Sequence, residues 1–143
     1  MNSILLVDDE ATICAELKRT LERFAYKVEM AHSFESALNF IEEVRFDAIL
    51  VEFNLKSERA AHPRSGRGVQ LIRQIRALGV TSPVLMLTAM EGEPYETASF
   101  DAGADDFILK TTSIPSLLSQ LRAHMRRHEE RLGEKTKTER ISM

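Results

Sequence analysis

Short apolar runs recur along the chain, and most of them end in a polar or acidic residue. Four runs are three or four residues long and lack strict polar alternation, which is typical of strands covered on both faces. They comprise residues 4–7, 48–51, 84–87 and 107–109. Residues 27–31 alternate weakly, with Val28 and Met30 apolar, so the pattern predicts five strands.

Between these runs, apolar residues recur every three or four positions, which is the period of one helix face. The first stripe contains Ile13, Cys14, Leu17, Leu21 and Phe24. We interpret Cys14 as a packing residue of this stripe, because nothing in its surroundings indicates a reactive thiol.

Later stripes predict four further helices, near residues 33–44, 69–78, 95–101 and 113–125. Ser33 and Ser113 are suited to capping their helix starts, and Gly79 can end the third helix. His124 and His128 lie four residues apart with no third metal ligand in view, so we expect both on the surface.

Five alternating strand and helix units predict an α/β fold, with a doubly wound five-stranded parallel sheet between helices on both faces. In such sheets ligands bind beyond the carboxyl ends of the strands. Candidate chemistry should therefore be sought in the residues that directly follow each strand.

Composition narrows the function. The chain has 143 residues, 43% hydrophobic and 29% charged, with a net charge of −3 and one cysteine. This balance is that of a globular domain and lacks the basic excess of a nucleic-acid binder. A single cysteine and no apolar stretch of about 20 residues lead us to expect a cytoplasmic protein without a membrane span.

The residues after the strands combine acids, a hydroxyl and an ammonium. They are Asp8 and Asp9 after the first strand, Glu52 after the third, Thr88 and Ala89 after the fourth, and Lys110 after the fifth. Converging carboxylates repel one another unless a cation lies between them. Oxygen ligands of this kind suit Mg²⁺, with Asp8, Asp9 and Glu52 as the candidate ligands.

The segments ILLVDDE, FDAILVE, PVLMLTA and AGADDFILK resemble, in order and spacing, the receiver domain of two-component response regulators. The resemblance covers about residues 3–127 and implies the (βα)5 flavodoxin-like receiver fold. It implies that the acidic pair binds Mg²⁺ and that Glu52 stands where the family has the aspartate that accepts phosphate from a histidine kinase. Thr88, Ala89 and Lys110 would form the phosphoryl pocket, and Phe107 would be the switch aromatic.

Glu52 departs from that pattern by one methylene, which moves its carboxylate about 1.5 Å further into the pocket. Phosphoryl transfer depends on close positioning, so we expect no normal phosphorylation at this site. The longer anion could reach Lys110 and Thr88 instead, which would leave Mg²⁺ binding weak or absent. Thr111 replaces the usual proline after the lysine, and the loop at residues 54–68 is long and basic.

The C-terminal third looks most like the winged-helix transcription-factor branch, which dimerises through its fourth helix, fifth strand and fifth helix. Asp105, Asp106 and Arg122 match charged positions of that face, whereas Gln120 stands where arginine is usual. We expect a receiver domain at 1–127 and a charged tail or linker start at 128–143.

We therefore predict a non-enzymatic signalling module that binds a sensor histidine kinase or effector protein, or a second copy, and does not itself bind nucleic acid. The alternative is a phosphoacceptor receiver that controls a transcriptional output domain absent from this chain. A haloacid-dehalogenase-like phosphatase would need Asp-x-Asp after the first strand, and a flavodoxin-like cofactor binder would need a hydroxyl- or glycine-rich phosphate loop there. The adjacent Asp8 and Asp9 disfavour both.

Overall fold

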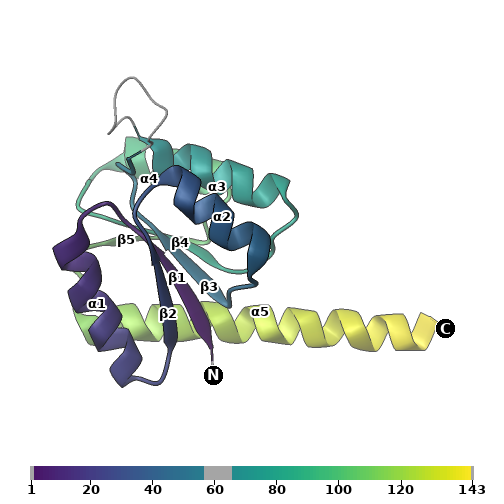
Figure 1. The fold of residues 1–143 in the computed structure, drawn as a ribbon. Coiled ribbons are helices and arrows are strands. Elements are labelled where there is room, and N and C mark those ends of the chain that lie inside the picture. The colour runs from purple at the N-terminus through teal and green to yellow at the C-terminus, as the bar shows by residue number, and fades with distance from the viewer. Residues whose placement is uncertain (1, 57–65, 143) are drawn as a thin grey trace.

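The computed structural model describes residues 2–56 and 66–142, with side chains as far as residue 134. Within these residues, five strands alternate with five helices (Figure 1). The strands are β1 (Ser3–Val7), β2 (Lys27–Ala31), β3 (Ala48–Val51), β4 (Val84–Thr88) and β5 (Asp106–Leu109). The helices are α1 (Ala11–Arg23), α2 (Phe34–Glu43), α3 (Arg67–Ala77), α4 (Glu93–Ala102) and α5 (Ile114–Ser142).

All strand pairs are parallel, and the strand order is β2-β1-β3-β4-β5. The register pairs Val7 with Val51 and Val51 with Met86, so β1 and β3 end level with each other and β4 continues two residues further, to Thr88. The predicted doubly wound parallel sheet is confirmed. Its switch in strand order lies between β1 and β3, where the acids of the sequence analysis emerge.

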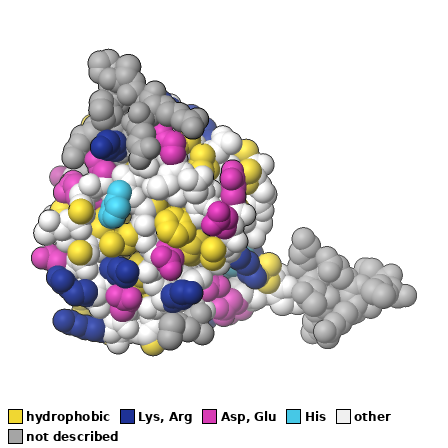
Figure 2. All heavy atoms as spheres, viewed as in Figure 1, with side chains coloured by type: hydrophobic (Ala, Val, Ile, Leu, Met, Phe, Trp, Pro, Cys, Tyr) yellow, Lys and Arg dark blue, Asp and Glu magenta, His cyan; other side chains and the backbone are white. Residues whose placement is uncertain are grey.

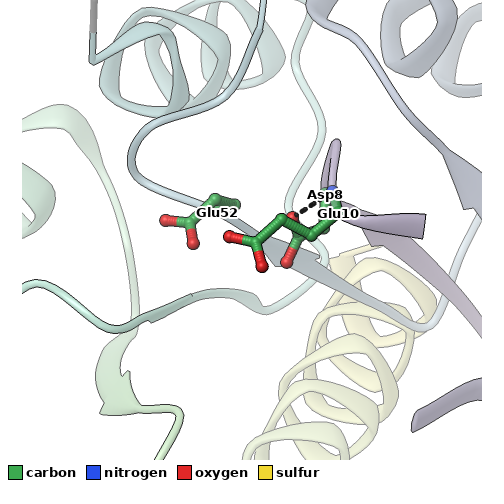
Figure 3. A group of neighbouring side chains, drawn as sticks. All are labelled: Asp8, Glu10 and Glu52. Carbon is green, nitrogen blue, oxygen red and sulfur yellow. Dashed lines mark hydrogen bonds between the residues drawn. The ribbon is translucent and has the colours of Figure 1, made fainter. Parts of the chain in front are cut away.

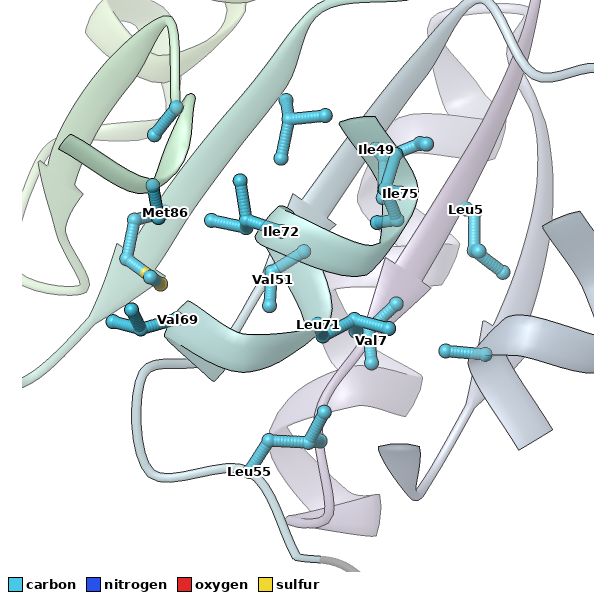
Figure 4. Packing of buried hydrophobic residues seen from close by; sticks show 14 of the residues in the cluster. Leu5, Val7, Ile49, Val51, Leu55, Val69, Leu71, Ile72, Ile75 and Met86 are labelled. Atoms are coloured by element: carbon cyan, nitrogen blue, oxygen red, sulfur yellow. The ribbon is translucent and has the colours of Figure 1, made fainter. Parts of the chain in front are cut away.

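Two apolar layers hold the helices to the sheet. Helices α2, α3 and α4 cover one face, and α1 and α5 cover the other (Figure 1). On the first face, Leu71, Ile72 and Ile75 of α3 pack fully buried against the central strands (Figure 4). Successive side chains of each strand point to opposite faces, so that Leu5 and Val7 of β1 join one layer while Ile4 and Leu6 join the other.

The predicted helix boundaries follow from local chemistry. Ser33 caps α2 by accepting from the Ser36 backbone N–H at 3.1 Å, and Ser36 completes the capping box by accepting from the Ser33 N–H. Gly79 follows α3 with a φ of 85°, a conformation that favours glycine.

Some apolar positions assigned to helix stripes are exposed instead. Phe24, Val44 and Leu78 are C-caps, so their backbones leave the helix before the side chains can reach the core. Ile13 is 42% exposed although Cys14 beside it is buried, because consecutive helical residues point about 100° apart.

Helix α5 continues without interruption past residue 127 and extends well beyond the sheet (Figure 1). His128 is only 5% exposed, and its Nε2 lies 3.1 Å from the Thr81 Oγ1. The expectation of a surface histidine at 128 is therefore wrong, because the helix stays against the sheet for another turn. The domain boundary at residue 127 stays a prediction.

Positive and negative side chains alternate over the face shown in Figure 2, with hydrophobic side chains gathered near its middle. None of the helices in the described ranges is long and apolar enough to span a bilayer. Most of the long loop predicted at 54–68 lies outside the described residues. Gly68, which we had placed in that loop, belongs to the first turn of α3.

Candidate functional site

The candidate site lies at the carboxyl ends of β1, β3, β4 and β5. Backbone bonds continue the sheet into it, because the Glu52 N–H donates to the Val7 carbonyl at 2.9 Å and the Lys110 N–H donates to the Thr88 carbonyl at 2.9 Å. The first residues after the strands are therefore held almost as firmly as the strands themselves.

Glu52 is at the centre of the site and is only 5% exposed. Its Oε1 lies 2.7 Å from the Lys110 Nζ, and its Oε2 accepts a 2.6 Å hydrogen bond from the Thr88 hydroxyl. The Oε2 atom also accepts from the Asn54 backbone N–H at 3.1 Å. Both carboxylate oxygens are thus engaged by the groups that the resemblance assigns to a phosphoryl ligand.

Asp8 shares the same ammonium, with its Oδ2 2.7 Å from the Lys110 Nζ, while its Oδ1 accepts from the Glu10 backbone N–H at 3.0 Å. Burial raises the pKa of Asp8 even though Lys110 opposes this shift. Burial alone would lower the pKa of Lys110, but its bonds to Asp8 and Glu52 outweigh burial and raise it. Lys110 therefore stays charged, as the cation that two buried carboxylates require.

A third carboxylate approaches this pair. Ligand oxygens of Asp8, Glu10 and Glu52 all lie within 4.8 Å of one another, and their side chains converge in Figure 3. By type and spacing these three acids could hold a hard divalent cation such as Mg²⁺. The sequence analysis missed Glu10 and named Asp9, which is not in this group; the role assigned to Asp9 stays a prediction.

The remaining pocket residues differ in how far they are buried. Thr88 is fully buried, and its hydroxyl also accepts from the Met90 backbone N–H at 3.2 Å. Ala89 is exposed, and Phe107 is partly buried against the core. Burial raises the pKa of the Cys14 thiol to about 12, which agrees with its interpretation as a packing residue.

Glycine at position 68 lets α3 approach the site closely. A Cβ there would overlap the Glu52 carbonyl and lie 2.9 Å from the Phe53 backbone, and the Gly68 N–H donates to the Phe53 carbonyl at 3.0 Å. Phe53 in turn makes an edge-to-face contact with Tyr95 of α4 at 5.1 Å between ring centroids. The segment after β3 is therefore clamped between α3 and α4.

The Lys110–Thr111 peptide is trans, as are all peptide bonds in the described segments. The departure from Lys-Pro is thus accommodated without an unusual backbone isomer. The Nδ1 atom of His32 lies 3.0 Å from the backbone carbonyl oxygen of Asp8.

The charged residues assigned to a dimer face are mostly engaged within the protomer. Asp105 accepts from Arg76 at 2.8 Å, and Asp106 lies 2.9 Å from the His124 Nε2. Gln120, in the usual arginine position, donates weakly to Asp106 at 3.4 Å. Arg122 is exposed.

This arrangement of acids, hydroxyl and lysine at the ends of a β2-β1-β3-β4-β5 sheet is that of a signalling receiver. The response regulator receiver domain family matches residues 4–122, and the chain belongs to that family. It is thus a receiver domain of two-component signal transduction, a class of generally non-enzymatic signalling domains.

Among curated proteins, the chain is similar to the response regulators MprA of Mycobacterium avium and Mycobacterium tuberculosis. Each is 36% identical over 124 residues, which cover 87% of this chain and 51% or 50% of the relative. The chain therefore spans about half the length of these relatives.

Solved structures agree on the fold. A CheY-like receiver domain protein from Methanospirillum hungatei has a TM-score of 0.80 and 26% identity, over 92% of this chain and 98% of that one. The BeF3-activated N-terminal receiver domain of Klebsiella pneumoniae RstA has a TM-score of 0.78 and 27% identity, over 87% of this chain and 99% of that one.

Proposed function

We propose that this receiver is not phosphorylated at the usual position and acts through protein–protein interaction, with Glu52 itself filling the phosphoryl pocket. The observation that carries the proposal is the double engagement of Glu52, by Lys110 at 2.7 Å and by Thr88 at 2.6 Å.

Phosphorylation would require the acceptor to face an incoming phosphoryl group while Lys110 and Thr88 bind the transferred oxygens. Here both groups already bind the acceptor. An incoming donor would have to break these bonds in a buried site, where each bond to a charged group contributes roughly 1.5–3 kcal/mol. A glutamate accommodated in this way is a poor nucleophile in a poor position.

The same bonds make Glu52 a partial imitation of the phosphorylated state. Its charge is −1, whereas an acyl phosphate would carry roughly −1.5 to −2 and offer more acceptor oxygens. A permanent imitation of this kind leaves the domain in one state, so regulation must come from partner binding or from the amount of protein.

Weak Mg²⁺ binding is part of the proposal. Asp8 and Glu52 each direct an oxygen at the Lys110 ammonium, which already supplies the positive charge that Mg²⁺ would otherwise bring. Of the three candidate ligands, Asp8 and Glu52 are bound to Lys110, so Mg²⁺ would have to compete with this buried, charged lysine for both of them.

The partner we propose is a sensor histidine kinase or an effector protein. Homodimerisation through α4, β5 and α5 is less well supported, since Asp105 and Asp106 are bonded to Arg76 and His124 of the same protomer. A dimer would have to exchange these bonds for new ones across the interface.

A second candidate is a working phosphoacceptor that controls a transcriptional output domain. It is favoured by the span of the match, because about half of each MprA relative extends beyond the matched region. In that case Glu52 would swing away from Lys110 when the domain meets its kinase.

Intact mass spectrometry after acetyl phosphate treatment separates the two candidates. We expect no phosphoryl adduct on the wild-type protein with Mg²⁺ or with EDTA, and a Mg²⁺-dependent adduct on Glu52→Asp. Glu52→Gln is the matched control, because it keeps the length of the side chain and removes the nucleophile. An adduct on the wild type that is lost in Glu52→Gln would establish the second candidate instead.

A further inference from the structure

A cavity with charged residues in its lining lies at the opposite end of the sheet from Glu52. It has a volume of about 500 Å³ and lies between α5 and the connections that precede β4 and β5. Its polar lining comes from Arg76, Thr81, Asp105, His128 and Arg131. Thr81, His128 and Arg131 take no part in the pocket around Glu52 or in the proposed function.

Arg76 forms the fixed wall of this cavity. Its Nε donates to the Gly103 carbonyl at 3.0 Å, and its Nη1 donates to the carbonyls of Val80 at 3.0 Å and Ser82 at 2.8 Å. Its Nη2 donates to Asp105 at 2.8 Å. These bonds use four of the five N–H groups of the guanidinium and neutralise Asp105, which leaves one Nη2 hydrogen for a ligand.

The opposite wall comes from α5. His128 lies against Thr81, with 3.1 Å between Nε2 and Oγ1, and Arg131 follows it by three residues, so both lie on one helix face. Arg131 is exposed and forms no ion pair in the part of the chain for which side chains are described. Among the residues with described side chains, no carboxylate pairs with this guanidinium, which lines the cavity.

The electrostatic surroundings of His128 are positive overall. Burial lowers the pKa of His128, and the charges of Arg45 and Arg131 lower it further. Asp105 and Asp47 oppose this shift, but Asp105 is bound to Arg76 and Asp47 accepts from the Ser3 N–H at 2.7 Å. The lining of the cavity holds two guanidinium groups, Arg76 and Arg131, and one carboxylate, Asp105, which is paired with Arg76, so the charge of Arg131 is in excess.

We propose that this cavity is a binding site for a small tetrahedral oxyanion, either sulfate or the phosphate group of a small molecule. Arg131 and the remaining Nη2 hydrogen of Arg76 would supply charge-assisted donors, with Thr81 and His128 completing the site. The volume accommodates a ligand larger than the anion alone. Bound there, the anion would join α5 to the body of the domain.

Sulfate is a suitable probe because its charge is constant between pH 5 and 8. The full chain, labelled at its histidines, would be titrated by NMR in sulfate and in chloride at equal ionic strength. If the anion binds protonated His128 about tenfold more tightly than the neutral form, linkage raises the His128 pKa by about one unit. His32 and His124 do not line the cavity, so their ring signals should show no saturable response to sulfate.

The variants Arg131→Gln and Thr81→Val should each weaken the saturable response to sulfate, while Arg127→Gln should retain it, because Arg127 is exposed on α5 and does not line the cavity. A second titration with inorganic phosphate and pyrophosphate tests whether a phosphate group substitutes for sulfate. Equal shifts of all histidines, or equal losses in Arg127→Gln and Arg131→Gln, would show general screening and overturn the proposal. Because the readout is independent of phosphorylation, its failure would leave the role of Glu52 untouched.

Discussion

Replacing Lys110 with methionine tests whether one ammonium holds the site together. The change keeps most of the apolar stem and removes the charge that lies 2.7 Å from both Asp8 and Glu52. Side-chain exposure is 14% for Lys110, 5% for Asp8 and 6% for Glu52, so water cannot replace the lost partner. Breaking a buried pair by deleting one member costs about 3–5 kcal/mol.

The free energy of unfolding can be measured by urea denaturation at pH 7. With a dependence on urea of about 1–3 kcal/mol per molar, the lost stabilisation lowers the midpoint by roughly 1–5 M. Lys27→Met is the matched control, because that lysine is exposed on β2, and we expect its effect to stay within about 0.5 kcal/mol.

The pH dependence gives a second check on the same variant. Without Lys110 to oppose it, burial raises the pKa of Asp8 further. As the pH falls, a carboxyl group with a raised pKa takes up a proton in the folded protein at a higher pH than in the unfolded chain. Lys110→Met should therefore recover stability relative to the wild type as the pH falls from 7 towards 5. A loss below about 1 kcal/mol, with the same pH profile as the wild type, would refute the reasoning.

Three further changes test the framework around the site. Gly68→Ala should destabilise the fold by about 2 kcal/mol or more, because its Cβ would overlap the Glu52 carbonyl. Gly133 has open space around it, so Gly133→Ala should be neutral or stabilising by up to about 1 kcal/mol. Equal thermal midpoints for the two variants would contradict the close approach of α3 to Glu52. Burial lowers the pKa of His128, so the unfolded chain takes up a proton below pH 6.5 more readily than the folded protein does. The free energy of unfolding of the wild type should therefore fall, relative to His128→Gln, by up to about 1.4 kcal/mol per pH unit below pH 6.5. Denaturation at several pH values measures this difference, and parallel pH profiles of the two proteins would contradict the burial of His128. Ser33→Ala should cost about 1 kcal/mol in urea denaturation through the lost cap of α2, and an unchanged midpoint would argue against it.

The sheet was predictable because buried parallel strands are continuous apolar runs. The run at 48–51 coincides with β3, and all four of its residues are buried. A strand that has neighbours on both sides and helices above and below leaves no face for polar residues, so the pattern is local and visible in the sequence. The pocket residues were predictable for a related reason, because each follows a strand directly and parallel strands end at one edge.

Residues that act across the fold were not predictable in this way. Glu10 joins Asp8 and Glu52 only because the turn after β1 brings its side chain back towards β3. The apolar period of α5 shows which face is buried, but not that Thr81 lies opposite His128. Gly68 carried no signal of its closeness to Glu52, because that contact is set by the packing of α3 and not by the helix itself.

By itself, the sequence determined the class of fold and the chemical groups of the pocket, since hydrophobic period and strand-end position are local properties. Tertiary structure decided how those groups are paired. Asp8 and Glu52 share Lys110, Thr88 binds Glu52, and Arg76 neutralises Asp105. These pairings depend on distances of about 3 Å between residues that are far apart in the chain. Hydrogen bonds and buried ion pairs require such distances, and no periodicity along the chain specifies them.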